Sequence, residues 1–215
     1  MVMANILIFG GTFDPVHNGH LQTACAAQAK LRADRVVFIP ANTSPHKLAA
    51  SISSATPQQR LAMLRLAIGD NPFMEVSEVE LQRPPPSYTL DTLSMMRRDC
   101  PNDVLTLLIG ADQLEALHTW RGIITILKNT PVAVLPRPGY PIPAESPHLP
   151  QRLWNRICAS ELDIPQYPIS STAIRQRLGH GLSVTDQIPA AVLDYICRHR
   201  LYGYTAASTP ERRIP

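Results

Sequence analysis

The stretch of this sequence that first suggests chemistry is GGTFDPVHNGH, residues 10–20, which directly follows the apolar run ILIF. Two adjacent glycines allow a sharp bend and let a ligand approach the main chain without a Cβ in the way. His17 and His20 are three residues apart, so in a first helical turn they share one face, where either ring can donate a hydrogen bond to a phosphate oxygen. The stretch therefore predicts an anion site at the end of a buried strand.

Other interpretations of the histidine pair remain open at this point. A glycine turn with two hydrogen-bonded structural histidines has the same spacing. A zinc site is less favoured, because no carboxylate or cysteine follows at ligand spacing. The stretch matches neither GxGxxG nor GxxxxGK[ST], so it supports neither a dinucleotide fingerprint nor a P-loop.

A second candidate anion site lies in ISSTAIR, residues 169–175. Ser170, Ser171 or Thr172 can cap a helix while hydroxyl and N–H groups face an anion, and Arg175 follows one turn later. A serine-rich cap on its own is more often structural. Two helix N-termini with cationic side chains in one chain favour instead a site for a triphosphate.

The elements that must position these residues alternate along the chain. Continuous apolar runs of strand length, as in strands buried on both faces, occur at residues 6–9, 35–40, 104–110 and 131–135. Helical patterns occupy residues 19–31, 56–70, 90–96, 113–120, 152–159, 170–179 and 188–203. Strands that alternate with helices imply right-handed βαβ crossovers.

We therefore expect an α/β fold, a doubly wound, Rossmann-like parallel sheet with helices on both faces and a small C-terminal helical part. In such a sheet the first strand-to-helix turn is the usual place for a phosphate, and GGTFDPVHNGH occupies it. We expect one domain over residues 1–204, with the C-terminal helical part from about residue 150, and a disordered tail over residues 205–215.

Composition narrows the class of protein. With 215 residues, 45% of them hydrophobic and 17% charged, the chain has an ordinary globular balance, and no apolar run approaches the roughly 18 residues that cross a bilayer. We expect no membrane association, no signal peptide and a cytoplasmic location. The net charge of +3 mildly favours an anionic ligand. The sequence has no dense stripe of Lys and Arg, so we do not expect nucleic acid binding. The scattered cysteines have no metal-type spacing, and nothing in the sequence predicts the oligomeric state.

Together, GGTFDPVHNGH and ISSTAIR resemble the nucleotidyltransferase superfamily with (T/H)xGH and ISSTxxR motifs, whose members transfer a nucleotide from ATP or CTP and release pyrophosphate. Three more stretches are similar to those of the bacterial nicotinate mononucleotide adenylyltransferase family, IPANTSPHK (39–47), PSYTLDTL (86–93) and GADQLEALHTW (110–120). The resemblance runs from about residue 5 to 204. Phosphopantetheine adenylyltransferase, a close relative in mechanism, is shorter and lacks SYTLDTL and LHTW.

The resemblance implies that ATP and nicotinate mononucleotide give nicotinate adenine dinucleotide and pyrophosphate in NAD biosynthesis. The mononucleotide phosphate would attack the α-phosphorus of ATP directly and in line. Mg²⁺ is the implied cofactor, with phosphate oxygens and water as its expected main ligands. Two alternatives stay open: the same chemistry with nicotinamide mononucleotide or phosphopantetheine as the acceptor, and a regulatory module that binds ATP without turnover.

The resemblance also implies residue roles. It makes His17, His20 and Arg175 the catalytic residues that stabilise charge on the phosphates. The implied ATP contacts are Gly10, Gly11, Thr12, Phe13, Asp112, Ser171 and Thr172, with Asp112 as the carboxylate for a ribose hydroxyl. The implied nicotinate mononucleotide contacts are Asn42, Lys47, Tyr88, Thr89, Trp120 and Arg137, with Trp120 on the pyridine ring and backbone N–H groups at Tyr88 and Thr89 on the carboxylate.

Without the resemblance, several of these residues have ordinary structural interpretations. Trp120 is as well explained by a place in the core. Asp112 has the position of an N-cap for a helix that starts at the next residue. Lys47 and Arg137 have the character of solvated surface charges.

Overall fold

A single five-stranded sheet organises the molecule. The computed structural model describes residues 3–43, 55–146 and 148–204, so predicted Lys47 and the expected tail at 205–215 lie outside the described residues. All strand pairs are parallel, in the order β3-β2-β1-β4-β5. The strands are β1 (Asn5–Gly11), β2 (Arg35–Pro40), β3 (Met74–Val76), β4 (Val104–Gly110) and β5 (Val132–Leu135). The order reverses between β1 and β4, which makes their carboxyl ends the expected ligand site.

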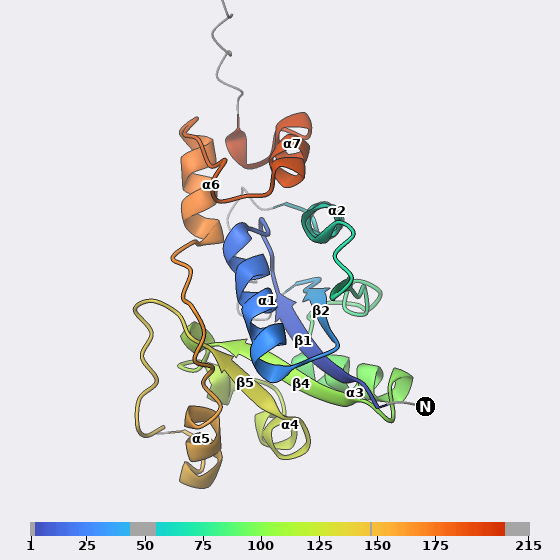
Figure 1. The fold of residues 1–215 in the computed structure, drawn as a ribbon, viewed down its shortest axis with the longest axis vertical. Helices are drawn as coiled ribbons and strands as arrows, with labels where there is room; N and C mark the ends of the chain where they lie inside the picture. Colours follow the sequence, from blue (N-terminus) through green and yellow to red (C-terminus); the bar gives the residue numbers. More distant parts are fainter. Residues whose placement is uncertain (1–2, 44–54, 147, 205–215) are drawn as a thin grey trace, which may run out of the picture.

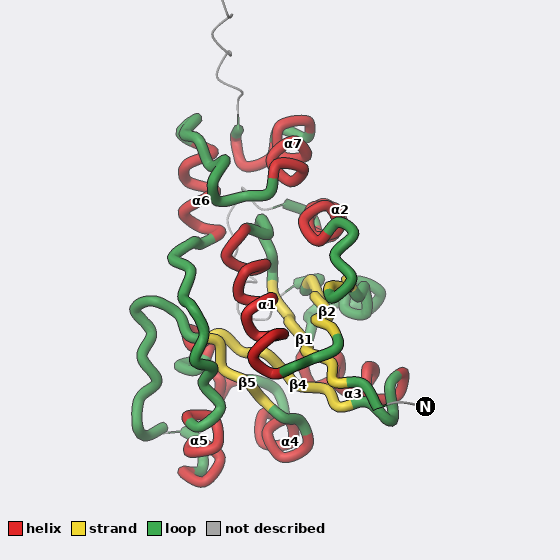
Figure 2. Tube along the Cα trace, viewed as in Figure 1, coloured by secondary structure: helices red, strands yellow, loops and turns green. Residues whose placement is uncertain are grey.

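Helices cover both faces of this sheet (Figures 1 and 2). The α-helices are α1 (Asn18–Leu31), α2 (Pro57–Ile68), α3 (Thr89–Asp99), α4 (Ile123–Asn129), α5 (Gln151–Cys158), α6 (Ser171–Gly179) and α7 (Ala190–Arg198). Single 3₁₀ turns are η2 (Ala111–Gln113), η3 (Leu117–Thr119) and η4 (Leu201–Gly203). Helices α1 and α2 pack on one face, whereas α3, α4 and α5 pack on the other, and α6 and α7 join the buried cluster of the first face from beyond the strands. The expected doubly wound α/β fold is confirmed.

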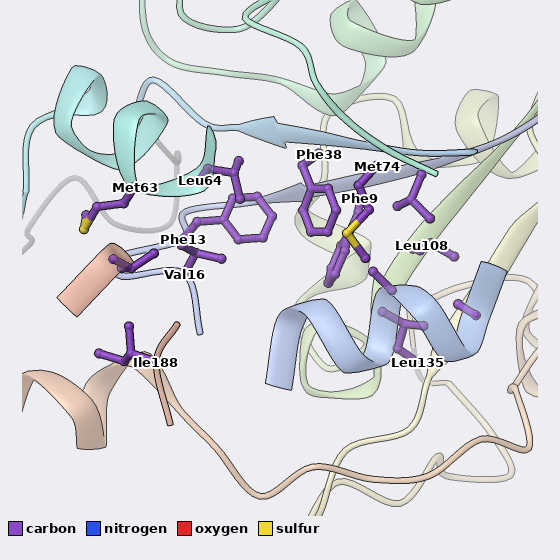
Figure 3. Close-up of a cluster of buried hydrophobic side chains, with 14 of the residues drawn as sticks. Phe9, Phe13, Val16, Phe38, Met63, Leu64, Met74, Leu108, Leu135 and Ile188 are labelled. Atoms are coloured by element: carbon purple, nitrogen blue, oxygen red, sulfur yellow. The ribbon is translucent and has the colours of Figure 1, made fainter. Parts of the chain in front are cut away.

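The first face carries an aromatic cluster directly beneath the turn that follows β1 (Figure 3). Phe9, Phe13 and Phe38 lie with ring centroids 5.4 to 5.7 Å apart. Phe13 is 2% exposed although its φ of 51° is in the left-handed region. Its ring folds back against Gly11, where an added Cβ would come within 2.9 Å of Phe13 Cζ. The second glycine of the motif is therefore required by packing.

Local capping signals match the observed helix starts. Thr56 Oγ1 accepts from the Gln59 N–H at 3.2 Å and Gln59 Oε1 accepts from the Thr56 N–H at 2.9 Å, a capping box with Pro57 at the first helical position.

Among the described residues no helix is long and apolar enough to cross a bilayer.

The prediction of one helix over residues 113–120 is wrong. The structure forms the separate turns η2 and η3 there. Leu114 and Leu117 are both buried, and their spacing of three matches the three residues per turn of a 3₁₀ helix. Trp120 then leaves η3 with extended backbone, at φ −69° and ψ 130°.

Candidate active site at the carboxyl ends of β1 and β4

A cavity of about 590 Å³ opens where the strand order reverses. It gathers residues from all parts of the chain, including most of those predicted from sequence. The predicted residues that line it are Gly10, Gly11, Thr12, Phe13, His17, His20, Tyr88, Thr89, Asp112, Trp120, Arg137, Ser171, Thr172 and Arg175. Asn42 is not part of the lining, and its side-chain amide donates to the Arg83 carbonyl at 3.0 Å.

The two histidines cap α1 reciprocally. His17 is the N-cap, and its Nδ1 accepts from the His20 N–H at 3.3 Å while His20 Nδ1 accepts from the His17 N–H at 3.3 Å. The rings stack with centroids 3.7 Å apart and planes 22° apart. Because each Nδ1 accepts, a neutral ring carries its proton on Nε2. The pair therefore caps the helix with two residues that also line the cavity.

His17 is a neutral donor rather than a cation. Its side chain is 4% exposed, and burial lowers its pKa from 6.5 to about 4, with the positive charge of Arg137 adding to the effect and its own backbone hydrogen bond opposing it. The expectation of cationic side chains at both helix N-termini is thus wrong for His17, because the turn encloses the ring.

Helix α6 carries the second motif and docks on the first. Ser170 is the N-cap and accepts from the Ala173 N–H at 3.2 Å. The Ser171 hydroxyl donates to the Pro15 carbonyl at 2.9 Å, and Arg175 Nη1 donates to the Asp14 carbonyl at 2.7 Å. These bonds bring the N-terminus of α6 to the same cavity as the N-terminus of α1. The remaining guanidinium donors of Arg175 lie beside Thr172, whose Oγ1 accepts from Nη2 at 3.4 Å.

The ends of β4 and β5 contribute an ion pair. Arg137 Nη1 lies 2.8 Å from Asp112 Oδ2. The other carboxylate oxygen, Oδ1, is buried and has no hydrogen-bond partner among the described residues. Asp112 lies within η2, whose N-cap is Gly110, so it does not cap a helix. Asp112 nevertheless lines the cavity, where a carboxylate is an acceptor for a ligand hydroxyl.

The far end of the cavity combines aromatic rings with positive charge. Tyr88 is the N-cap residue of α3 but makes no side-chain capping bond, so the first N–H groups of the helix, beginning at Thr89, are not capped. Trp120 is half-buried against the core of the second face. The guanidinium carbon of Arg121 lies 4.8 Å from the Tyr88 ring centroid, and Arg121 Nη1 lies 3.3 Å from Asp91 Oδ2. Aromatic rings and a helix N-terminus here suit a flat ring that bears a hydrogen-bond acceptor.

Comparison with known proteins agrees with this geometry. The cytidylyltransferase-like family matches residues 8–177. A protein of Roseiflexus sp. (strain RS-1), named probable nicotinate-nucleotide adenylyltransferase, is 44% identical over 207 residues, which cover 94% of this chain and 100% of the relative. A protein of the same name from Thermus thermophilus is 41% identical over 195 residues, covering 91% and 97%. The chain belongs to the nicotinate-nucleotide adenylyltransferase family.

Solved structures of other proteins support the fold. The Plasmodium falciparum nicotinic acid mononucleotide adenylyltransferase complexed with NaAD superposes with a TM-score of 0.73 at 17% identity, covering 94% of this chain and 98% of that one. A putative nicotinate-nucleotide adenylyltransferase from Vibrio parahaemolyticus gives 0.65 at 19% identity, covering 95% and 98%. The doubly wound architecture is therefore shared at low sequence identity.

Sequence reasoning missed several residues at this adenylyltransferase site. Arg121 directly follows Trp120 in the sequence, so the prediction of Trp120 as a site residue could have suggested Arg121 as well. Glu80 and Thr92 line the cavity as a buried pair in which the Thr92 hydroxyl donates to Glu80 Oε1 at 2.7 Å, with Arg83 donating to Thr92 at 2.5 Å. No pattern in the sequence connects these three residues. Asp14 was within the first motif but was given no role.

Proposed function

We propose that the protein joins ATP and nicotinate mononucleotide to give nicotinate adenine dinucleotide and pyrophosphate. The observation that carries the proposal is the convergence of two helix N-termini, those of α1 and α6, on one cavity that His17, His20 and Arg175 line. Backbone N–H groups and the positive ends of two helix dipoles there favour a polyanion. The family to which the chain belongs supports this reaction in NAD biosynthesis.

The chemistry asks the protein for positioning and charge stabilisation. An oxygen of the mononucleotide phosphate attacks the α-phosphorus of ATP in line, the new P–O bond forms, and the bond to the bridging oxygen breaks with its electron pair leaving on pyrophosphate. His17 and His20 donate from Nε2 to the transferred phosphate. Arg175 and the N-terminus of α6 hold the departing β- and γ-phosphates. The Asp112 carboxylate accepts from a ribose hydroxyl.

A divalent cation belongs to this reaction, and we propose Mg²⁺. Among the residues that the structure describes, no three His, Cys, Asp or Glu side chains form a group that could hold a metal ion. Mg²⁺ prefers oxygen ligands and usually keeps several waters, so the phosphates of ATP are its proposed main ligands. We also propose that the enzyme works in the cytoplasm on small-molecule substrates alone, without nucleic acid or membrane.

The acceptor end favours an acid over an amide. The uncapped N-terminus of α3 at Tyr88 and Thr89 offers N–H donors, and Arg121 adds a positive charge beside the Tyr88 ring. A nicotinate carboxylate is an acceptor for all of these groups. A nicotinamide would turn NH₂ donors toward N–H donors, at a cost of about 1 to 3 kcal/mol for each buried group left unpaired. Nicotinate mononucleotide is thus the better acceptor.

Two substitutions test the proposal. We expect His20→Ala and Arg175→Ala each to lower kcat by at least about 10²-fold, the scale of losing one charge-stabilising donor. Arg177→Ala is the matched control in the same helix, because Arg177 donates to the Ser183 carbonyl and does not line the cavity. Pyrophosphate release is the measurement. Near-normal turnover of both variants would refute the proposal.

A further inference from the structure

A buried polar cluster lies behind the turn that holds the two histidines. It consists of Asp14 from the turn, Arg60 from α2 and Tyr202 from η4, which are 5%, 4% and 6% exposed. Arg60 and Tyr202 do not line the cavity, so they touch no substrate there. Two charged side chains buried this deeply are costly unless the hydrogen bonds of each are satisfied.

Arg60 bridges the two loops that follow strands β1 and β2. Its Nη1 donates to the Thr12 carbonyl at 2.6 Å, and its Nη2 donates to the carbonyls of Ala41 at 2.6 Å and Asn42 at 3.0 Å. The planar fork of a guanidinium can reach three carbonyls in this way, whereas a lysine ammonium is a point donor. Arg60 thereby fixes the start of the turn.

Tyr202, close to the C-terminal end of the described chain, contacts Asp14 in the middle of the turn after β1. Its hydroxyl donates to Asp14 Oδ1 at 2.7 Å, and the same oxygen accepts from the Ala55 N–H at 3.1 Å. Tyr202 has a φ of 60°, a left-handed conformation that a non-glycine residue adopts only where its surroundings impose it. Burial, followed by the charge of Asp14, raises the pKa of Tyr202, so the hydroxyl stays a donor.

Asp14 connects this cluster to the phosphate site. Its side chain accepts from Tyr202 while its main-chain carbonyl accepts from Arg175 at 2.7 Å. We infer that Tyr202 and Arg60 are positioning residues that fix the turn, and through Asp14 orient Arg175, for the phosphates of ATP. The inference rests on the proposed function, because it takes ATP as the ligand of Arg175. The acceptor end at α3 is not part of the cluster.

Binding measurements on the full chain test this inference. We expect Tyr202→Phe to weaken ATP binding by about three- to tenfold, the scale of one buried hydrogen bond, and Arg60→Lys to weaken it further. Nicotinate mononucleotide binding should stay within about twofold of wild type in both variants. Tyr195→Phe is the matched control, because this ring lies in the same C-terminal part, tilted against His199 with centroids 4.1 Å apart, and the hydrogen bonds of Asp14 come from Ala55, Tyr202 and Arg175 instead. Calorimetry measures both ligands, and thermal unfolding verifies the fold.

Two outcomes would overturn the inference: wild-type ATP affinity in folded Tyr202→Phe, or an equal loss of affinity for both ligands, which indicates general loosening. If Arg60→Lys fails to fold, Tyr202→Phe decides alone. The test is separate from that of the proposed function. A wild-type protein that binds ATP but does not turn over nicotinate mononucleotide contradicts the proposed reaction, while the ATP affinities still decide the role of Tyr202.

Discussion

Each histidine of the pair uses Nδ1 to cap α1, and both residues line the cavity. The sequence spacing predicted a shared face for His17 and His20. It did not predict the reciprocal cap or the neutral state of His17, because these depend on burial and on Arg137, more than a hundred residues further along the chain. Residue types and spacing were therefore enough to predict where the site lies, whereas the protonation state of His17 could be derived only from the folded structure.

The lowered pKa of His17 predicts acid sensitivity of the fold. Between its unfolded value of 6.5 and its folded value of about 4, the unfolded chain binds a proton that the folded protein does not. Stability should therefore fall as pH drops through this window, by up to about 3 kcal/mol from this group. His17→Asn keeps a good N-cap residue and removes the titration, so its unfolding free energy should depend less steeply on pH.

Urea unfolding of wild type and His17→Asn from pH 7.5 to 4 measures this difference, since the other acidic groups are common to both proteins. His118→Asn, which makes the same substitution at an exposed histidine, is the control variant. Identical slopes for wild type and His17→Asn would contradict a neutral, buried His17.

Arg121 predicts a charge-dependent preference for the acid acceptor. Its side chain is half-exposed, so its effect should be modest and salt-dependent. Arg121→Met should lower kcat/KM for nicotinate mononucleotide by about fivefold at low salt and leave nicotinamide mononucleotide nearly unaffected. Arg121→Lys should retain part of the preference. Equal losses for the two acceptors in Arg121→Met would mean that this residue acts by packing rather than by charge.

At the scale of elements, the sequence predicted helices wherever a capping or proline signal marked them. Thr56-Pro57 and the Ser-Ser-Thr run began α2 and α6 as expected. It missed β3 and α4. Strand β3 has three residues, and α4 has seven and begins after Gly122 in left-handed conformation with no side-chain cap. Tertiary packing rather than local sequence decides such short elements.

The junction of β4 and η2 gives a test at this scale. An added Cβ at Gly110 would come within 2.5 Å of Asp112 Oδ1, although the backbone φ of −67° suits alanine. Gly110→Ala should therefore displace the Asp112 carboxylate, break its pair with Arg137 and lower kcat/KM for ATP by about tenfold, with little change in melting temperature. Gly179→Ala is the control, since its Cβ would meet only Tyr202 O at 3.5 Å. Unchanged ATP kinetics in Gly110→Ala would show that Asp112 does not act at this position.

Over the whole molecule, the alternation of strands and helices was sufficient to predict the sheet and its ligand-binding edge. The docking of α6 on the first turn was not predictable in detail, because Ser171 bonds Pro15 across 156 residues. The C-terminal helices share a core with the sheet, where Ile174 and Val192 lie in the same cluster as Leu7 and Phe38. This favours the predicted single domain over a separate C-terminal unit.

A shared core predicts one cooperative unfolding transition. Calorimetric and van't Hoff enthalpies should agree, and amides of α6 and α7 should exchange by the same global opening as those of β1. An early transition confined to the C-terminal helices would contradict the single domain.

The most direct test of the central claim is pyrophosphate release from ATP and Mg²⁺ with nicotinate mononucleotide, nicotinamide mononucleotide and phosphopantetheine offered in parallel. We predict the highest kcat/KM with nicotinate mononucleotide, because the uncapped end of α3 and Arg121 both favour its carboxylate. Faster turnover with another acceptor would contradict the acceptor site described for Tyr88 to Trp120. ATP binding without turnover of any of the three would contradict the reaction itself.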